Sequence, residues 1–478
     1  ITKGKLRGVL SMGMFCSTDE LGLTPEGTAT GIMILDEGTP IGVDICEVLG
    51  LNEDVVEFEI TSNRPDCFSI IGLARETAAT FDREFHIPDP SKYPTTSDNE
   101  NDYAKVVIED YELCPRYLGK VVKNVKVGPS PEWMQRRLNA CGIRAINNIV
   151  DITNYVMLEY GQPMHAYDLD NVKGHTITVR RGRAGETLKT LDDQPHELNH
   201  ELIVISDAER AIGVAGVMGG ANSEVTENTV NILFEAATFK ASTVRRGAKA
   251  LGMRTDASAL FEKGLDVYNL DGAIDRACQL ITEMGAGEVM SGTVEAAAEM
   301  PKPFTLPLEA EKINSFLGMN VPKDTMIEIL KKLEFEVEND IITVPSFRPD
   351  IESRADIAEE IARIYGYDEI PSTLMKGSIT GGGKTYVQKL EDKVKEILVA
   401  CGLYEIMTYS FVDPADNKLL EIPEGDSKYN FVKIQNPLGE ENSVMRTTLL
   451  ASLMEVLKTN FNKRNAAASL FELGRIYI

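Results

Sequence analysis

The sequence contains few of the features that mark membrane, secreted or zinc-binding proteins. No stretch of its 478 residues approaches the roughly 20 uninterrupted apolar residues that a membrane-spanning helix needs. The opening residues 1–5 are not followed by the apolar core of a signal peptide. Seven cysteines are scattered without a Cys-x-x-Cys pair, which argues against a disulfide framework and against a zinc site. We therefore expect a cytoplasmic protein with reduced thiols and no membrane partner.

Positive charge is also scarce, since 49 basic residues face 74 acidic ones and the formal net charge is -25. A surface this acidic repels nucleic acid at long range, so any contact with RNA must be local. Short basic clusters do occur, for example at Arg180-Arg181 and Arg245-Arg246, although such clusters are more often solvated faces. The 43% of hydrophobic residues are enough for sizeable cores, and the length predicts about three domains.

The spacing of apolar runs, glycines and prolines predicts a multidomain α+β protein. Residues 1–42 are expected to close a small β-barrel, and 43–112 to form a connecting α/β segment that ends in a polar linker. Residues 113–295 alternate strands with helices and predict one mixed α/β domain. Residues 296–371 predict a small α+β domain, and 385–478 predict an amphipathic helix followed by strands and a helical stretch. Because the chain begins without Met and stops inside a strand-like run, we expect a piece of a longer protein.

The connecting segment 43–112 is expected to contain a strand at 55–60, a helix at 71–80 and the polar linker at 87–102. The run of glycines at 381–383 before Lys384 looks like a phosphate-binding loop, but the motif needs a glycine where this chain has Ser378. We interpret that run as a flexible linker.

The most informative stretch covers residues 153–168. It opens with a hydroxyl and a carboxamide, Thr153-Asn154, and continues through a Gln-Pro step to His165, one of only five histidines. Backbone geometry and a side chain that titrates near neutral pH are thus specified together. This concentration of polar groups predicts a functional site.

An acidic helix is predicted from residue 351 or 353 to 365, with Gly366 as its stop. At about 100° per residue its acids fall on one face, and Asp350 can join them from the preceding loop. Carboxylates without a thiol or imidazole suit a hard cation such as Mg2+. The alternative is a surface ion pair between Glu359 and Arg363, which stand at i, i+4. The candidate metal ligands are Asp350, Asp356, Glu359 and Glu360.

A further acid, Glu235, follows the apolar run 231–234. Its position predicts the end of a strand, where it is either a site carboxylate or an exposed charge.

Six separated segments, in order along the chain, resemble those of the beta subunit of bacterial-type phenylalanyl-tRNA synthetases. The resemblance extends over the whole chain, and agreement at six ordered places is implausible by chance. The segments are Thr153-Asn154 with 162–168 (QPMHAYD), 213–220 (GVAGVMGG), 234–237 (FEAA), 255–258 (TDAS) with 261–266 (FEKGLD), 348–350 (RPD) with the acidic helix, and 445–450 (MRTTLL).

The resemblance implies that residues 113–295 are an editing domain that hydrolyses tRNA(Phe) wrongly charged with tyrosine. Glu235 is then the candidate partner of the tyrosine hydroxyl, and His165 the group that orients the attacking water. Glycines let backbone amides approach the substrate. The implied catalytic residues are His165, Glu235, Thr153 and Asn154, and the implied substrate-binding residues are Gly216, Gly219, Thr255, Ala257 and Ala166.

The resemblance also implies partners and cofactors. Phenylalanine activation with ATP would be carried out by an alpha subunit, in a heterotetramer of two alpha and two beta subunits that binds tRNA(Phe). The acidic helix would hold Mg2+ shared with that subunit. Residues 1–42 would end an OB-like tRNA-binding barrel, 296–371 would be winged-helix-like, and 385–478 would begin an inactive module with a class II synthetase-like antiparallel sheet.

Two other functions compete with editing. The chain could be a non-catalytic tRNA-binding and assembly module whose polar pocket is only structural. It could also be a free-standing hydrolase that uses a metal on the acidic helix.

Overall fold

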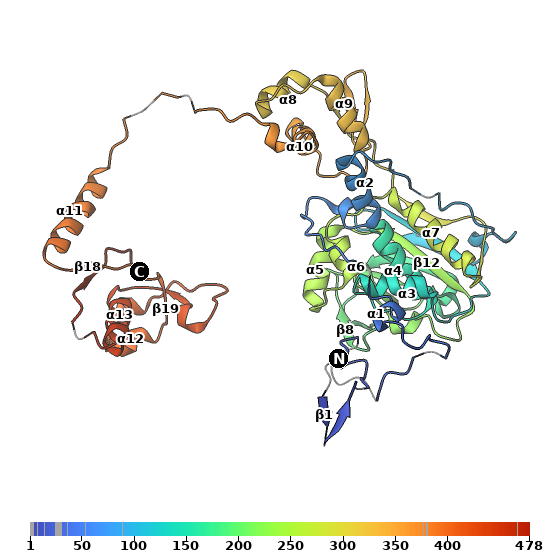
Figure 1. Cartoon of the computed structure of the whole chain (residues 1–478), viewed down its shortest axis with the longest axis horizontal. Coiled ribbons are helices and arrows are strands. Elements are labelled where there is room, and N and C mark those ends of the chain that lie inside the picture. Colours follow the sequence, from blue (N-terminus) through green and yellow to red (C-terminus); the bar gives the residue numbers. More distant parts are fainter. Residues whose placement is uncertain are drawn as a thin grey trace. The chain divides into compact units, whose positions relative to one another are not determined.

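The computed structural model describes residues 4–6, 8–13, 15–23, 31–35, 37–52, 54–87, 89–375, 377–378, 381–465 and 467–478. The chain divides into two compact units, Ile1–Ser372 and Thr373–Ile478, which are drawn in Figure 1. Helices and strands occur in both, so the predicted mixed α+β class is confirmed. None of the described helices is long and apolar enough to cross a membrane.

The beginning of the first unit contains little regular structure. Its strands β1 (Gly4–Leu6) and β2 (Val9–Ser11) form an antiparallel hairpin, and the short helix α1 (Ile45–Val48) follows. The described residues between 12 and 42 lie in no strand, so the expected barrel is not confirmed. The expected strand at 55–60 is also wrong: its described residues carry no strand, and Val55, Val56 and Phe58 are exposed. Helix α2 (Ile70–Thr80) is as predicted, with Ser69 accepting a hydrogen bond at its N-cap.

Two five-stranded sheets form the centre of the first unit. The first sheet has the order β11-β10-β9-β6-β3, and the second has the order β13-β4-β12-β5 with β14 also paired to β4. A separate hairpin joins β7 to β8. The strands are β3 (Lys105–Ile108), β4 (Arg116–Lys123), β5 (Met164–Asp168), β6 (Thr176–Arg181), β7 (Glu186–Lys189), β8 (Pro195–Leu198), β9 (Ile203–Ser206), β10 (Ala211–Val214), β11 (Met218–Gly219), β12 (Ile232–Thr238), β13 (Glu288–Val289) and β14 (Val294–Ala297).

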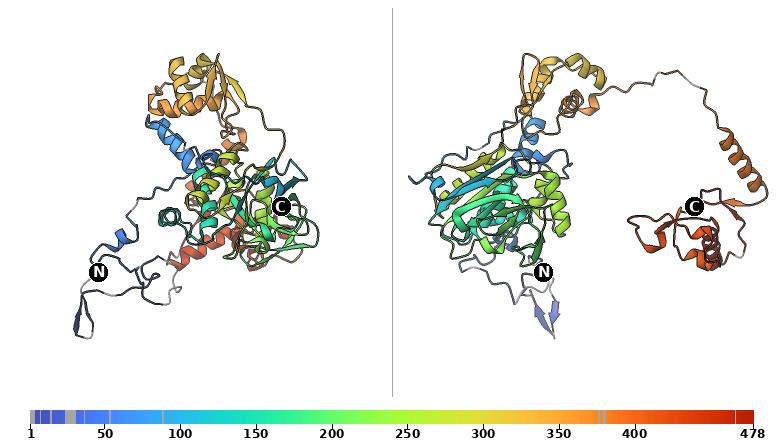
Figure 2. Two further views of the ribbon diagram at one scale, coloured as in Figure 1. Left: turned by 90° about the vertical axis from the view of Figure 1, so that its right-hand side faces the viewer. Right: turned by 180° about the vertical axis from the view of Figure 1, so that it is seen from behind.

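Helices cover the second sheet, as Figures 1 and 2 show for α4 and α7 around β12. Residues 113–295 therefore alternate strands and helices as predicted, although β5 and the helix before it were not placed from the sequence. The helices are α3 (Glu132–Ala140), α4 (Asn148–Tyr160), α5 (Ala241–Leu251), α6 (Asp256–Phe261) and α7 (Asn269–Glu283).

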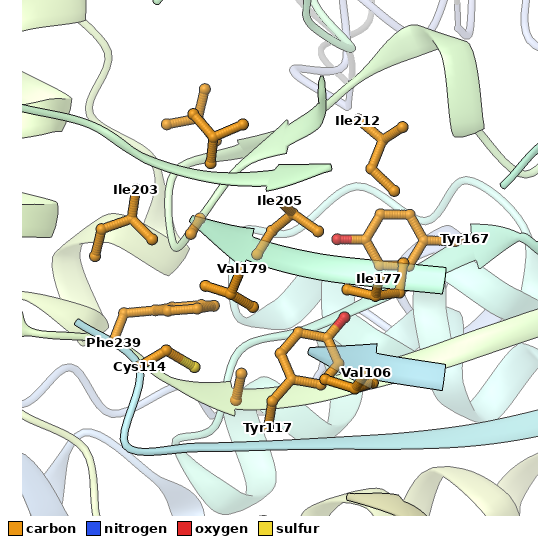
Figure 3. Packing of buried hydrophobic residues seen from close by; sticks show 14 of the residues in the cluster. Val106, Cys114, Tyr117, Tyr167, Ile177, Val179, Ile203, Ile205, Ile212 and Phe239 are labelled. Atoms are coloured by element: carbon orange, nitrogen blue, oxygen red, sulfur yellow. The ribbon is translucent and has the colours of Figure 1, made fainter. Parts of the chain in front are cut away.

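The second sheet has a different hydrophobic core on each face. Because side chains alternate along a strand, Tyr117 and Val121 of β4 point into one core while Leu118 and Val122 point into the other. The first core also contains residues of the first sheet, including Ile205, and is shown in Figure 3. The second core is shared with α4 and α7. Both faces of strand β12 are thus buried, and all seven of its residues are buried.

A smaller α+β portion completes the first unit. Strands β15 (Thr305–Pro307), β17 (Ile341–Thr343) and β16 (Glu336–Glu338) form a three-stranded sheet in that order. Its helices are α8 (Ala310–Leu317), α9 (Lys323–Lys332) and α10 (Arg354–Tyr365). The acidic helix α10 is as predicted, since Ser353 caps its start and Gly366 ends it.

The second unit contains short elements. Helix α11 (Tyr386–Ala400) is capped by Thr385 and α13 (Leu450–Asn462) follows the single turn α12 (Asp416–Leu419). Strands β18 (Tyr404–Glu405) and β21 (Leu470–Phe471) pair in parallel, and β19 (Phe411–Val412) pairs antiparallel with β20 (Val444–Met445). These two-stranded pairs do not confirm the expected antiparallel sheet module.

The predicted linker at 87–102 is anchored to the central sheets over its second half. The Tyr93 hydroxyl donates to Asp275 Oδ1 of α7 at 2.6 Å, and the Thr96 amide donates to the Val289 carbonyl at 2.8 Å. The carboxyl of Glu100 is fully buried, with one oxygen 3.6 Å from Lys120 Nζ. The predicted boundary between segments at 112 and 113 stays a prediction.

We expect stability of the first unit to depend on the protonation of Glu100. Burial raises the pKa of its carboxyl to about 8, against the charge of Lys120. The folded protein then binds a proton that the unfolded chain has lost, so the free energy of unfolding should fall as pH rises from the ordinary glutamate value to about 8. Urea unfolding between pH 5 and pH 8.5 measures this slope.

Glu100→Gln should flatten that pH dependence, because the amide carries no titrating proton. Glu109→Gln, which changes an exposed acid just after β3, is the matched control and should keep the slope of the parent chain. An unchanged slope in Glu100→Gln would contradict the assignment.

Candidate functional site

A cavity of about 90 Å³ opens between the two central sheets. Strands β5 and β12 of the second sheet line one side, and β9, β10 and the turn to β11 line the other. Helix α6 closes a third side. The lining residues are Pro163, Met164, His165, Tyr167, Ile205, Gly213, Val214, Ala215, Gly216, Val217, Met218, Gly219, Glu235, Ala257 and Phe261.

Strand register brings Glu235 and His165 together. In the antiparallel pair β12–β5 the two residues are directly opposite, so their side chains lie on the same face of the sheet. That face points into the core between the sheets. Two residues far apart in the sequence, both predicted for the site, are thus brought to one cavity.

The Glu235 carboxylate is buried and bound by two tyrosines. Tyr117 Oη donates to its Oε2 at 2.7 Å, and Tyr167 Oη donates to the same oxygen at 2.6 Å. Figure 3 shows the two rings among the apolar side chains of this core. Burial raises the pKa of Glu235, against the hydrogen bonds from Tyr167 and Tyr117, which lower it.

The predicted position of Glu235 at the end of a strand is wrong. It is the fourth of seven residues in β12, with a strand paired on each side. Only 7% of the residue is exposed, which removes the alternative of an exposed strand-end charge. A carboxyl in the middle of a central strand is costly to bury, and among the described residues no cation pairs with it. Its role in binding or catalysis stays a prediction.

The His165 imidazole is neutral. Burial lowers its pKa to about 4, and its Nε2 atom is shielded from solvent without a hydrogen-bond partner among the described residues. Its ring packs edge-on against Tyr167, with ring centres 4.5 Å apart. An unpartnered buried nitrogen beside a cavity can accept a hydrogen bond from a ligand or a water molecule.

Glycines shape the wall opposite His165. A Cβ at Gly219 would lie 2.5 Å from His165 Cε1, so only glycine allows this approach. Gly216 has a positive φ of 68°, and a Cβ there would meet the ring of Phe261 at 3.0 Å. Both predicted glycines therefore line the cavity for definable reasons.

Helix α6 contributes Ala257 directly and Thr255 indirectly. Ala257 is a lining residue. Thr255 caps α6 through a reciprocal bond with Ser258, and its Oγ1 donates to the Val217 carbonyl at 2.8 Å. Thr255 thus fastens the helix to the turn that lines the cavity.

Four predicted site residues are not among the lining residues: Thr255, described above, and Thr153, Asn154 and Ala166. Thr153 and Asn154 lie on α4, and Thr153 Oγ1 donates to the Val150 carbonyl at 2.7 Å within that helix. Ala166 is buried on the other face of β5, in the core shared with α4 and α7. Their roles in binding or catalysis stay predictions.

Sequence analysis missed the two tyrosines that bind Glu235. Tyr167 lies inside the quoted motif, and Tyr117 lies near the start of the segment 113–295 that was predicted to alternate strands with helices. The only available signal was alternation: Tyr167 is two residues after His165, so both must face the same side of a strand. Nothing in the sequence shows which strands pair with β12.

The four acids predicted as metal ligands are largely engaged by other groups. Arg348 forms a two-bond pair with Asp350 at 2.9 and 2.8 Å, and its Nη1 donates to Glu360 Oε2 at 2.6 Å. Arg363 also donates twice to Glu360, at 2.8 and 2.6 Å. Although burial opposes it, these two guanidinium groups lower the pKa of Glu360 to about 2.

The remaining two acids do not complete a ligand set. Asp356 accepts from the amides of Glu352 and Ser353 at the start of α10, and these bonds lower its pKa against burial. Glu359 is exposed. In this arrangement the four residues do not fit a shared magnesium ion, because two carboxylates already hold arginines and one holds the helix cap. Mg2+ binding here stays a prediction.

Among the residues that the structure describes, one group of acids and a thiol has the spacing of metal ligands: Asp66, Cys67 and Glu76. It is an unsuitable site, because Arg64 pairs with both carboxylates and burial raises the pKa of the Cys67 thiol to about 12. A protonated thiol is a poor ligand.

Comparison with known families covers most of the chain. The family described as "B3/4 domain" matches residues 113–286 and includes the cavity. The family "tRNA synthetase B5 domain" matches residues 306–367, and "Phenylalanyl tRNA synthetase beta chain CLM domain" matches residues 370–478.

Curated relatives match over the whole chain. The proteins named "Phenylalanine--tRNA ligase beta subunit" from Clostridium tetani and Clostridium acetobutylicum are 49% and 46% identical over 482 residues. These alignments cover 100% of this chain and 61% of each relative, so the chain spans about three fifths of their length. A crystal structure of an N-terminal fragment of the phenylalanyl-tRNA synthetase beta-subunit from Pyrococcus horikoshii is 18% identical, covering 64% of this chain and 85% of that one, with a TM-score of only 0.33.

We expect the imidazole of His165 to stay neutral throughout the physiological range, because burial lowers its pKa to about 4. With histidine labelled at the ring carbon, the NMR signal of His165 should not move between pH 8 and pH 5. His165→Gln identifies that signal among those of the five histidines. A midpoint above pH 6 would show that the ring is solvated and would contradict the described burial.

Proposed function

The chain belongs to the family of phenylalanine–tRNA ligase beta subunits, and from that premise we propose that its central cavity hydrolyses tyrosine from mischarged Tyr-tRNA(Phe). The chain would also support the ATP-dependent charging of tRNA(Phe) by an alpha subunit, within a heterotetramer of two alpha and two beta subunits. The first activity would reside in the residues described above, and the second would need the partner.

The observation that carries the editing proposal is the buried carboxylate of Glu235 at the cavity. Two tyrosines bind its Oε2, whereas among the described residues Oε1 has no hydrogen-bond partner. Tyrosine carries a hydroxyl that can donate to Oε1, and phenylalanine does not. A site that hydrogen-bonds a substrate hydroxyl rejects the analogue that lacks it by large factors, because its own buried polar group is then left unpaired.

The size of the cavity suggests how the substrate would lie. A dry cavity that holds benzene has a volume of about 150 Å³, whereas this one has about 90 Å³. The hydroxyl end of the ring would enter it, and the ester would remain at its mouth. The absence of a side chain at Gly219 would let the aminoacyl group approach closely.

His165 would hold the attacking water. With its proton on Nδ1, the neutral ring would offer Nε2 as an acceptor, and no other described group uses that atom. A base with a pKa of about 4 removes a proton weakly at neutral pH, so its main contribution would be to orient the water toward the ester carbon. Two side chains on adjacent strands would thus have different tasks: Glu235 would select the tyrosine ring, and His165 would position the water.

Magnesium has no part in this hydrolysis. The candidate ligands on α10 are paired with Arg348 and Arg363 or cap the helix, and none of them is a lining residue of the cavity. ATP and Mg2+ would serve the charging reaction through the alpha subunit.

We expect the chain to remove tyrosine from Tyr-tRNA(Phe) faster than phenylalanine from Phe-tRNA(Phe). Glu235→Gln should narrow the ratio of the two rates by about tenfold or more, because it removes a charged acceptor while keeping the shape of the side chain. Deacylation of both charged tRNAs, with the alpha subunit present, measures the ratio.

Glu288→Gln alters an exposed acid on β13, a strand of the same sheet that pairs with β4 and not with β12, and should leave the ratio unchanged. Deacylation of both charged tRNAs at only the uncatalysed rate would instead favour a non-catalytic tRNA-binding and assembly module.

We also expect EDTA to leave the rate of deacylation unchanged, once the tRNA is kept folded with spermidine. The reason is that the cavity contains a carboxylate and an imidazole with no further ligand converging on them. Loss of activity with EDTA, and its return with Mg2+, would instead favour a metal-dependent hydrolase on α10.

A further inference from the structure

We infer that Tyr117 and Tyr167 are positioning residues that fix the direction of hydrogen bonding at Glu235, so that Oε1 can only accept from an incoming phenolic hydroxyl. This inference rests on the proposed function and adds two specificity-determining residues to it. Neither tyrosine was predicted for the site from the sequence.

The geometry commits both tyrosine hydrogens to one oxygen. Each phenol has a single hydrogen, and both are donated to Glu235 Oε2, at 2.7 and 2.6 Å. Neither hydroxyl can then donate to a ligand. Oε2 is saturated by two donors, and the hydrogen-bonding capacity that is left belongs to Oε1.

Strand pairing explains why two tyrosines reach the same carboxylate. Residues directly opposite Glu235 are Gly119 on β4 and His165 on β5. Tyr117 precedes the first by two positions and Tyr167 follows the second by two, so the tyrosines are diagonal neighbours on either side of β12. Diagonal neighbours lie about 7–8 Å apart, a distance that only long side chains span. Gly119 carries no side chain that could stand between Tyr117 and Glu235.

The two rings are held rigidly. Tyr117 is fully buried and Tyr167 is 2% exposed, and both belong to the core between the sheets. Figure 3 shows the two rings among apolar side chains that include Ile177 and Ile205 of the facing sheet. Ionisation of either phenol is suppressed, because burial and then the charge of Glu235 raise both pKa values well above the ordinary one. Both hydroxyls therefore keep their protons, and remain donors, at neutral pH.

Other groups near Glu235 supply no charge that could replace these donors. His165 on β5 is neutral, and burial raises the pKa of the Cys114 thiol before β4. The facing sheet presents apolar or glycine residues to the cavity, including Ile205 and Val214. Among the described residues no ion pair involves Glu235. The tyrosine hydroxyls are therefore what favours the carboxylate over the neutral acid against the effect of burial.

The form of Glu235 decides what the site accepts. As a carboxylate with Oε2 occupied, it accepts from tyrosine at Oε1, and a phenylalanine ring would leave Oε1 of a buried carboxylate without a donor. As a neutral acid it could itself donate, and the penalty against phenylalanine would shrink. Loss of one tyrosine donor should raise the pKa of Glu235 further, so selectivity should be lost at a higher pH than in the parent chain.

The test uses the full chain with the alpha subunit and three variants: Tyr117→Phe, Tyr167→Phe and the double variant. The ratio of kcat/KM for Tyr-tRNA(Phe) over Phe-tRNA(Phe) is measured from pH 5.5 to 8.5. Each single change should lower the ratio at neutral pH by about tenfold, and the pH at which selectivity falls to half should move upward. Phe-tRNA(Phe) should be hydrolysed as fast as before or faster.

Tyr155→Phe is the matched control. Tyr155 is a buried tyrosine of α4 in the other core, and its hydroxyl accepts a bond from Arg137 at 2.7 Å. The change removes a hydroxyl from the same domain and should leave the ratio and its pH profile unchanged. Thermal unfolding of all variants separates selectivity from loss of folded protein.

The possible outcomes distinguish the inference about the tyrosines from the proposed function. A lower ratio with an upward shift of the profile supports the inference. If the parent chain prefers tyrosine but the variants keep its ratio and profile, or lose both rates equally, the tyrosines are only structural and the proposed function stands. If the parent chain shows no preference, the proposed function fails and the inference fails with it.

Discussion

The central part of this chain depends on the burial of one carboxylate without a cation. Glu235 lies in the middle of a strand that is paired on both sides, and within the described part of the chain its hydrogen bonds come from two neutral tyrosine hydroxyls on the neighbouring strands. That requirement ties β4, β12 and β5 to a single register, because a shift by one residue would turn both tyrosines to the opposite face. The register of the three strands therefore also determines the geometry of the cavity.

The acidic helix shows the opposite solution within the same chain. Its buried acid Glu360 is matched by Arg348 and Arg363, whose charges lower its pKa, whereas the phenols beside Glu235 only moderate the effect of burial. The arginines keep Glu360 ionised and bind both of its oxygens, which suits a structural role. At Glu235, Oε1 is left free and neighbouring groups can adjust the pKa of the carboxyl, which suits recognition of a ligand.

Sequence patterns predicted structure that depends on neighbouring residues, such as the ends of a helix. They failed where the structure depends on a strand or side chain far away in the sequence. Helix α10 was placed correctly because Ser353 and Gly366 mark its ends, and the family resemblance was confirmed by relatives that match over the whole chain. Residues 56–60 alternate as a strand would, but no strand of the described residues pairs with them. From the sequence, Glu235 could be either a site carboxylate or an exposed charge, because the choice depends on which strands pair with its own and in which register. Arg363 was weighed against Glu359 four residues before it, whereas the structure pairs it with Glu360 and with the distant Glu76.

The pairing of Arg363 with Glu76 belongs to a continuous series of opposite charges that joins two parts of the first unit. It runs from Asp66 through Arg64 to Glu76 on α2, and from there through Arg363, Glu360 and Arg348 to Asp350. Removing one member would take an ion pair from each of its neighbours, which are largely buried, so the effects of substitutions along the series should not be additive. The segment around α2 and the portion around α10 should consequently open as one cooperative block, with amide protons in both exchanging together.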